Sequence, residues 1–312
     1  MPNIRPMETR DREAAQRIVR LAFGTFLGEP DLDNFWIDRD YASARQGAEH
    51  VEAFAAEEDG ALVGSNFATR WGSFGFFGPL TIRPDRWEGK CAQPLVAAVC
   101  DAFDRWGVTQ AGLFTFPHSA KHVHLYGKFG FYPRFLTAIM AKPAAGGLRP
   151  GDMRHSELPP DDRRAAEDAT CALTDKIYDG LDLRSEIRTG AARGLGDTLL
   201  RWEAPSRLGA FAVCQWGAGS EAGADTLYVK FAAVRPGPGA EGHFVALLNA
   251  CGALAATVGM HNVLAGVNLA RDEAYRRMKA LGFRTAIQGV AMHRDNQPGF
   301  CRPGVYILDD WR

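Results

Sequence analysis

Apolar residues along this chain follow two periods, one typical of helices and one typical of strands. Residues 11–23 carry a single apolar helical face, whereas residues 51–56 and 61–69 read as two strands joined at the turn Glu58-Asp59-Gly60. The same patterns predict further strands at 4–6, 74–83, 111–116 and 131–142, and helices at 35–41, 93–106 and 122–128. Hairpins mixed with helices predict an α+β fold.

The second half of the chain repeats this order. Its predicted helices span 160–173, 242–259 and 273–281, and its predicted strands span 198–202, 209–216, 226–235, 262–267, 285–293 and 305–308. Two landmarks recur at one offset: Pro84 and Pro236 are 152 residues apart, as are Phe131 and Phe283. A repeat of this length in a chain about twice as long indicates a duplicated domain.

The length and composition suit two domains of ordinary size. The chain has 312 residues, of which 46% are hydrophobic and 23% are charged, enough to fill two cores. The Gly- and Pro-rich stretch 144–151 is the best linker candidate. We therefore expect domains at 1–143 and 152–312, each a mixed, mostly antiparallel sheet flanked by helices.

Charge and cysteine usage exclude several classes of protein. The net charge is −1 with no long basic run, which argues against an extended nucleic-acid surface. No run of eighteen apolar residues occurs, so we expect a soluble, cytoplasmic protein with no membrane partner. The six cysteines lack metal-binding spacing and are expected to be reduced, mostly buried thiols. We expect no metal site.

Residues 82–92 are predicted to form an anion-binding turn that attracts phosphate. A strand ends at 82–84, a loop follows, and a helix begins at about residue 92. Backbone N–H groups in the loop and at the helix start point outward there. An ordinary strand-to-helix turn has the same outline. The chemistry of the loop residues therefore has to discriminate between these two interpretations.

At this point the chain resembles the GNAT N-acyltransferase superfamily, in tandem. The family pattern, apolar-x-Pro-x-x-Arg/Gln-x-x-Gly-x-Gly/Ala, is matched at Ile82, Pro84 and Ala92 but not at Trp87 and Lys90. Gly89, one residue early, is expected to preserve the tight turn, and Lys90 to place an ammonium near a phosphate. The resemblance implies acetyl-CoA or another acyl-CoA as co-substrate, bound by Leu80, Ile82, Trp87, Glu88, Gly89, Lys90, Cys91, Ala92, Gln93 and Ser119.

Tyr126 lies five residues before Phe131, where the family places the acid that protonates the departing thiolate. A phenol stays protonated at neutral pH and suits this role, although a core tyrosine is the alternative. The base is unassigned, because 74–83 holds no acidic residue. His118 and His122 are candidates, His122 sharing a helical face with Tyr126, and an exposed loop is the other interpretation.

The second half departs further from the pattern. Met278 replaces the tyrosine, Pro238 removes a backbone donor, and Phe244 replaces the last small residue. The resemblance therefore implies catalysis in the first half and a structural or substrate-shaping second half. We expect a solvated C-terminal tail at Asp309 and Asp310. The aromatic stretch is expected to be core rather than an acyl or acceptor pocket: Trp71, Phe74, Phe76, Phe77, Phe114 and Phe116.

Three functions remain open from the sequence. The leading hypothesis is transfer of an acetyl or short acyl group from a CoA thioester to a primary amine of a small molecule by direct attack. The second uses a carrier-protein thioester or an aminoacyl-tRNA as donor, which is the one nucleic-acid partner considered. The third is a non-catalytic, regulatory pair of domains that binds a CoA-like ligand or a protein. The sequence sets neither the acceptor amine nor the oligomeric state.

Overall fold

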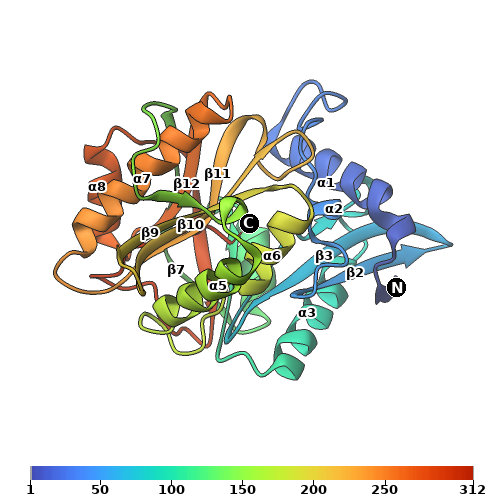
Figure 1. The fold of residues 1–312 in the computed structure, drawn as a ribbon. Helices are drawn as coiled ribbons and strands as arrows, with labels where there is room; N and C mark the ends of the chain where they lie inside the picture. Colours follow the sequence, from blue (N-terminus) through green and yellow to red (C-terminus); the bar gives the residue numbers. More distant parts are fainter. Residues whose placement is uncertain (1, 312) are drawn as a thin grey trace.

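A computed structural model describes residues 2–311, in which helices flank one long mixed sheet (Figure 1). The first half contributes, in chain order, β1 (Asn3–Pro6), α1 (Arg12–Leu27), α2 (Ala42–Arg45), β2 (Val51–Glu58), β3 (Ala61–Trp71), β4 (Phe74–Phe77), β5 (Thr81–Ile82), α3 (Ala92–Trp106), β6 (Gln110–Thr115), α4 (Ala120–Gly127) and β7 (Phe131–Pro143). The second half contributes β8 (Asp152–Arg154), α5 (Pro160–Thr174), α6 (Arg184–Ala192), β9 (Gly196–Ala204), β10 (Arg207–Gly217), β11 (Gly223–Val234), α7 (Ala240–Thr257), β12 (Asn262–Asn268), α8 (Asp272–Ala280), β13 (Arg284–Arg294) and β14 (Ile307–Leu308).

The sheet contains fourteen strands within residues 2–311. Their order is β1-β2-β3-β4-β6-β13-β7-β12-β11-β10-β9-β8, with β5 beside β3 and β14 beside β11. β4 is parallel to β6 and β11 is parallel to β12, whereas the other pairs among the described strands are antiparallel. The predicted α+β class and mostly antiparallel sheet are confirmed.

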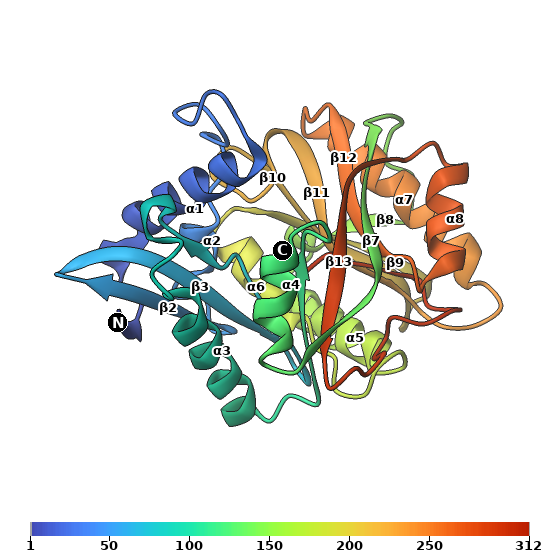
Figure 2. The ribbon, with the colours of Figure 1, turned by 180° about the vertical axis from the view of Figure 1, so that it is seen from behind.

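The two halves exchange strands in the middle of the sheet. β13 of the second half pairs with β6 of the first, opposing Val290 to Thr115, and β7 of the first half pairs with β12 of the second, opposing Met140 to Ala265. β7 and β13 also pair with each other, side by side between α4 and α8 (Figure 2). Each half therefore completes its sheet with a strand from the other.

Local sequence explains the main elements. In α1 the predicted apolar face is buried, and the helix ends at Gly28, which adopts φ 74° in the left-handed region. In the β2–β3 turn Asp59 and Gly60 have φ values of 50° and 75°, as a type I′ hairpin turn requires. These two predictions are confirmed.

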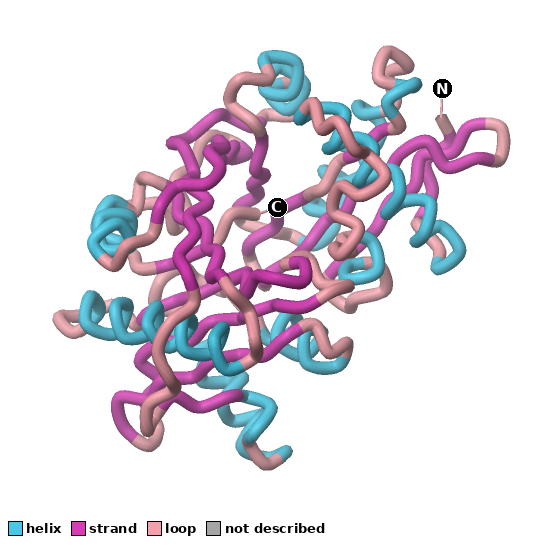
Figure 3. The backbone as a smooth tube through the Cα atoms, turned by 90° about the horizontal axis from the view of Figure 1, so that it is seen from above, coloured by secondary structure: helices cyan, strands magenta, loops and turns pink. Residues whose placement is uncertain are grey.

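Aromatic residues of the two halves share one core. Trp71 and Phe74 of the first half pack with Phe231 and Phe300 of the second, and ring centroids lie 5.2 Å apart for Trp71 and Phe231. Such a core resembles the interior of a single domain rather than a surface contact. The chain after β14 runs into this region, so it lies near the centre of the molecule, whereas β1 lies at the outer end (Figure 3).

The structure corrects three predicted elements. The helix predicted at 35–41 is absent from the described structure, because Trp36 adopts φ 51° and Arg20 donates to the carbonyl of Phe35; helix forms only at α2. The strand predicted at 74–83 breaks at Gly78. The helix α6 was not predicted, because its charged residues obscure its apolar face.

Candidate active site

In the first half, two neighbouring parallel strands separate beyond a particular residue pair. β4 and β6 run parallel as far as Phe77 and Leu113, and the chain then turns at Gly78, whose φ is 142°. Beyond this point β5 pairs with β3, opposing Ile82 to Gly64, while β6 pairs with β13. We call the divergence of residues 77–82 from residues 113–118 the first splay.

The second half contains the same divergence at the same register. Its last parallel pair is Val229 with Ala265, each 152 residues after Phe77 and Leu113. This second splay, residues 229–234 and 265–270, is filled by the chain's own β14. Ile307 and Leu308 pair with β11, and the N–H of Asp309 donates to the carbonyl of Gly266 on β12 at 3.0 Å.

Buried charges hold this C-terminal segment in place. The guanidinium of Arg271 donates to the carboxylate of Asp309 at 2.9 Å and to the carbonyl of Ile307 at 2.8 Å. The hydroxyl of Tyr228 donates to Asp310 at 2.7 Å, and Asp309 and Asp310 are each only 2% exposed. The expectation of a solvated tail is therefore wrong: ion pairing and strand pairing keep it inside.

Tyr126 lies at the base of the first splay. It projects from α4 into the core and is 7% exposed, with its ring edge-on to Phe77 at 5.6 Å. Burial raises the pKa of its phenol above the ordinary value of 10, so the hydroxyl stays protonated at neutral pH. Tyr126 therefore packs in the core, as the core interpretation predicts, and it also adjoins the first splay.

His122 and His118 extend this row of rings. The ring of His122 lies 6.4 Å from that of Tyr126 and 5.3 Å from that of Phe26 on α1, while exposed His118 stacks on Phe26 at 5.7 Å. Burial, with smaller contributions from the charges of Lys121 and His118, lowers the pKa of His122. His122 is therefore neutral at pH 7 and able to accept a proton. Ser119 precedes α4 and is buried.

Phe26 was not anticipated as a site residue. It lies on α1 and its ring is 5.1 Å from that of Phe116, so α1 packs beside the candidate site. The sequence signal was weak, since an aromatic residue near a helix end has many uses.

The predicted phosphate turn is anchored to the core at both ends. Ile82 and Cys91 are buried, Leu80 packs against this cluster, and Ala92 begins α3. Trp87 folds back and its indole N–H donates to the carbonyl of Ile82 at 2.9 Å. At the Arg/Gln position the chain therefore places a side chain that stabilises the turn itself.

Gly89 and Lys90 both take part in the tight turn: the N–H of Gly89 donates to the carbonyl of Arg86 at 2.9 Å, and Lys90 is the left-handed residue. Lys90 adopts φ 57°, whereas Gly89 lies outside the left-handed region. A Cβ at Gly89 would lie 3.1 Å from the carbonyl oxygen of Arg86, which is a tight contact that favours glycine for space. Lys90 thus occupies the pattern's glycine position with a glycine-like backbone.

Exposed charges connect this turn to α4. Glu88 pairs with Lys121 at 3.3 Å, next in sequence to His122. Gln93 is exposed in the first turn of α3, and the following Pro94 has no N–H to offer a ligand. The structure therefore brings the turn beside α4 with fewer backbone donors than a proline-free helix start would have.

The aromatic stretch divides between core and site. Trp71, Phe74, Phe76 and Phe77 are buried, which confirms the core interpretation for them. Phe114 and Phe116 are partly exposed; Phe116 adjoins the rings of His118 and Phe26, and Phe114 adjoins the ring of Phe116.

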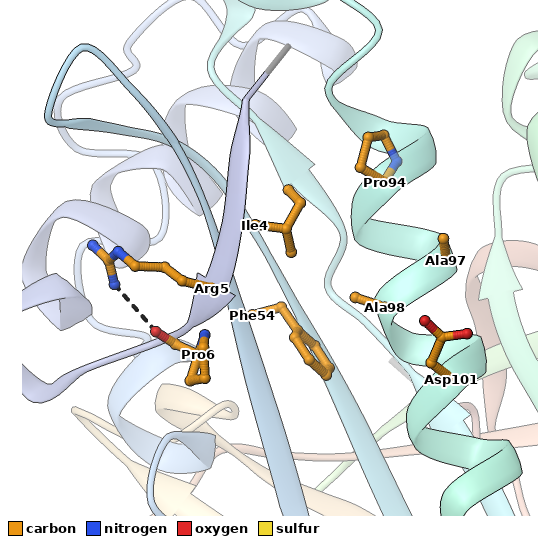
Figure 4. A pocket seen from close by; sticks show the side chains of 8 residues that line it. All are labelled: Ile4, Arg5, Pro6, Phe54, Pro94, Ala97, Ala98 and Asp101. Carbon is orange, nitrogen blue, oxygen red and sulfur yellow. Dashed lines mark hydrogen bonds between the residues drawn. The ribbon is translucent and has the colours of Figure 1, made fainter.

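A separate shallow groove lies between β1, β2 and α3. Ile4, Phe54 and Ala98 are among its lining residues, and Asp101 stands at its rim (Figure 4). Pro94, at the start of α3, also lines it, but none of the predicted site residues does, and we assign it no function.

Both halves thus diverge at the same register, and solved structures identify the fold. A candidate acetyltransferase from Pyrococcus horikoshii matches with a TM-score of 0.65 at 12% identity, covering 99% of this chain and 95% of its own. A GCN5-related N-acetyltransferase from Sphaerobacter thermophilus matches at 0.61 and 17% identity, covering 96% of each chain. A tandem GNAT protein from the clavulanic acid biosynthesis pathway matches at 0.56 and 12% identity, covering 96% of this chain and all of its own, 100%. The chain has the tandem GNAT fold, as the resemblance implied.

Two other comparisons find nothing. No family model matches the chain, and no curated protein matches it. Within residues 2–311 there is no helix long and apolar enough to cross a membrane, nor any cluster of side chains suited to a metal ion.

Proposed function

We propose that the first half is an N-acyltransferase, which moves an acetyl or other short acyl group from a CoA thioester to a primary amine of a small molecule. The observation that carries this proposal is the contrast between the splays: Tyr126 adjoins the first, whereas β14 fills the second. The names of the structural neighbours, which are N-acetyltransferases, support the same chemistry.

In the proposed mechanism the amine nitrogen attacks the thioester carbonyl, a C–N bond forms, and the C–S bond breaks. Tyr126 gives its phenolic proton to the departing thiolate, for which its raised pKa keeps the proton available. Neutral His122 accepts the proton that the amine loses. Residues 80–93 and Ser119 would hold the acyl donor, with Lys90 near its phosphates.

We assign catalysis to residues 1–143 and a supporting role to residues 152–312, joined by 144–151. The filled second splay and the buried Met278 in place of Tyr126 support this division. The six unpaired cysteines suit a reducing compartment, so we propose a cytoplasmic location.

The second candidate function is the same acyl transfer from a donor other than acyl-CoA, and the composition of the phosphate turn favours it. Trp87 serves the turn, Pro94 removes a donor, and Glu88 adds a negative charge where a phosphate would lie. A carrier-protein thioester or an aminoacyl-tRNA would depend less on this turn.

Native mass spectrometry of the chain titrated with acetyl-CoA tests the proposal, followed by release of free CoA thiol with a panel of amines. One bound acetyl-CoA per chain and amine-dependent thiol release are expected. Binding without turnover for any amine would favour a non-catalytic domain pair, and no binding would favour the carrier-protein or tRNA donor.

A further inference from the structure

A chain of buried polar side chains joins the two halves behind the first splay. We call it the interhalf network: Arg45, His50 and Trp71 from the first half, and Glu186, Glu221 and Lys230 from the second. Arg45 forms a bidentate pair with Glu221 at 2.9 and 3.0 Å, and Lys230 donates to Glu221 at 2.8 Å. Lys230 also lies 3.4 Å from Glu186, which bonds to His50 and Trp71 at 3.0 and 3.1 Å.

Opposite charges alternate along this network. The side chains of Arg45, Glu221, Lys230 and Glu186 are each exposed by 6% or less. Burial works against ionisation of Glu186 and Glu221, but Lys230 and Arg45 keep the pKa of these carboxyls below its ordinary value. Two cations and two carboxylates therefore balance, and loss of one would leave an uncompensated buried charge.

The network ends on the backbone where the first splay begins. Arg45 donates to the carbonyl of Gly78 at 2.5 Å, and the N–H of Gly78 donates to the carbonyl of Phe67 at 3.0 Å. Both polar backbone groups of Gly78 are therefore engaged, directly after Phe77, which packs on Tyr126. These two hydrogen bonds fix the direction in which the chain leaves β4.

The internal repeat also relates the interhalf network to the splays. Lys230 stands 152 residues after Gly78, so it occupies the matching position in the second half. There the chain carries a lysine side chain committed to Glu221 and Glu186. The position at which the second splay begins therefore carries Lys230, which holds the two carboxylates of the interhalf network.

We propose that Arg45 and Glu221 are positioning residues, through which the second half holds the Gly78 carbonyl and so sets the geometry of the first splay. This inference rests on the proposed function for its catalytic consequence. Its structural part, control of the Gly78 backbone by Glu221 through Arg45, stands independently and is tested without substrate.

The primary test is hydrogen exchange of the backbone over residues 77–82 in Glu221→Gln. The matched control is Glu167→Gln, because Glu167 is equally buried and pairs with His155 at 3.1 Å and with Arg188, all within the second half. We expect exchange over 77–82 to rise about tenfold in Glu221→Gln, the factor for one lost hydrogen bond, and to be unchanged in Glu167→Gln. Equal exchange in both variants would overturn the proposal.

A double variant separates positioning from simple stability. Arg45→Met with Glu221→Met removes one charge of each sign and leaves Lys230 paired with Glu186, so thermal stability should recover relative to Glu221→Gln. The bond to Gly78 is still missing, so exchange over 77–82 should remain fast. Recovery of both properties would show a merely structural network. If the double variant does not fold, Arg45→Lys decides, because lysine keeps the charge but lacks the fork that reaches both Glu221 and Gly78.

Turnover, once an amine is known, gives the catalytic readout. Glu221→Gln should lower kcat about tenfold while Glu167→Gln leaves it unchanged. Unchanged kcat in Glu221→Gln, despite faster exchange, would contradict the catalytic part. If no amine is ever acylated, the proposed function fails, and the exchange results still decide the role of Arg45 and Glu221.

Discussion

The two splays share one register but have different contents. The first diverges after Phe77 and Leu113 beside a phenol, and the second diverges after Val229 and Ala265 around β14. The last parallel pair has the same register in both halves, but the strands beyond it differ: β5 pairs with β3 in the first half, and β14 pairs with β11 in the second. A repeated fold can therefore fill one of its two splays with its own C-terminal strand and not the other.

Two matched positions explain the closure. Ser119 corresponds to Arg271, whose buried charge requires the carboxylate of Asp309. Phe114 corresponds to Gly266, where a Cβ would lie only 2.4 Å from the Cβ of Asp310. A charge that needs a partner and a glycine that leaves space together make a place for the tail.

The largest effect is expected from Tyr126→Phe. Loss of the general acid should reduce kcat roughly 10²- to 10⁴-fold while acetyl-CoA binding is retained. The matched change in the second half, Met278→Leu, should leave kcat unaltered, since Met278 is fully buried and similar in volume. Steady-state kinetics of both variants checks this, and an unaltered kcat in Tyr126→Phe would remove Tyr126 from the mechanism.

Next in size is the effect of Arg271→Met on stability. It leaves Asp309 buried without its cation, so the free energy of unfolding should fall by about 3 to 5 kcal/mol. Ser119→Ala, at the matching position, should cost less than about 1 kcal/mol because Ser119 forms no side-chain cap. Denaturant unfolding measures both, and equal losses would contradict the assigned role of the tail.

His122→Gln tests the base. With the pKa of His122 lowered from 6.5, the neutral, active form persists below pH 6.5, so the wild-type kcat/KM should fall only at more acidic pH. In the variant, the fall in kcat/KM at acidic pH should disappear, and the rate should be roughly 10²-fold lower. His118→Gln, on the exposed side of Phe26, should keep the wild-type profile, and loss of the acidic fall there instead would move the assignment to His118.

Gly266→Ala should loosen the second splay. The added methyl group meets Asp310, so we expect a loss of about 1 to 3 kcal/mol and faster hydrogen exchange over 305–311. Gly190→Ala is the control, because a Cβ in this helix meets nothing within 4 Å and alanine favours helix. Unchanged exchange over 305–311 in Gly266→Ala would show that the tail is held elsewhere.

The smallest effect concerns the two helix starts. Lys90 adopts a left-handed φ of 57°, so Lys90→Gly should stabilise the fold by about 1 kcal/mol at most. Its counterpart Gly242 lies inside α7, where Gly242→Ala should give about 0.5 to 1 kcal/mol through helix propensity. Thermal unfolding measures the stability of both variants. A loss of stability in Lys90→Gly would refute the backbone strain at Lys90.

The sequence predicted the repeat and most elements because they depend on local period and on spacing. The offset of 152 residues reappears in the register of both splays. The sequence could not predict the exchange of strands between the halves, because a β7–β12 pair and a β7–β6 pair bury the same apolar faces. The buried tail was missed for a related reason, since Asp309 and Asp310 read as solvated until Arg271 is placed beside them.

The candidate site was predictable in part. Tyr126 and His122 followed from spacing on one helix, and they do lie together. The turn was predicted around Gly89, but the left-handed conformation of Lys90 was not predicted, because residues other than glycine rarely adopt a positive φ. Phe26 and Arg45 come from segments distant in sequence, and no local pattern connects them to the site.

The most direct test of the account is hydrogen exchange of the wild-type chain with and without acetyl-CoA. The account predicts ligand protection over residues 77–93 and 113–126 and none over 229–244 and 265–278, because β14 already fills the second splay. Protection of the second set, or of both sets equally, would contradict the claim that the first half alone holds the acyl donor.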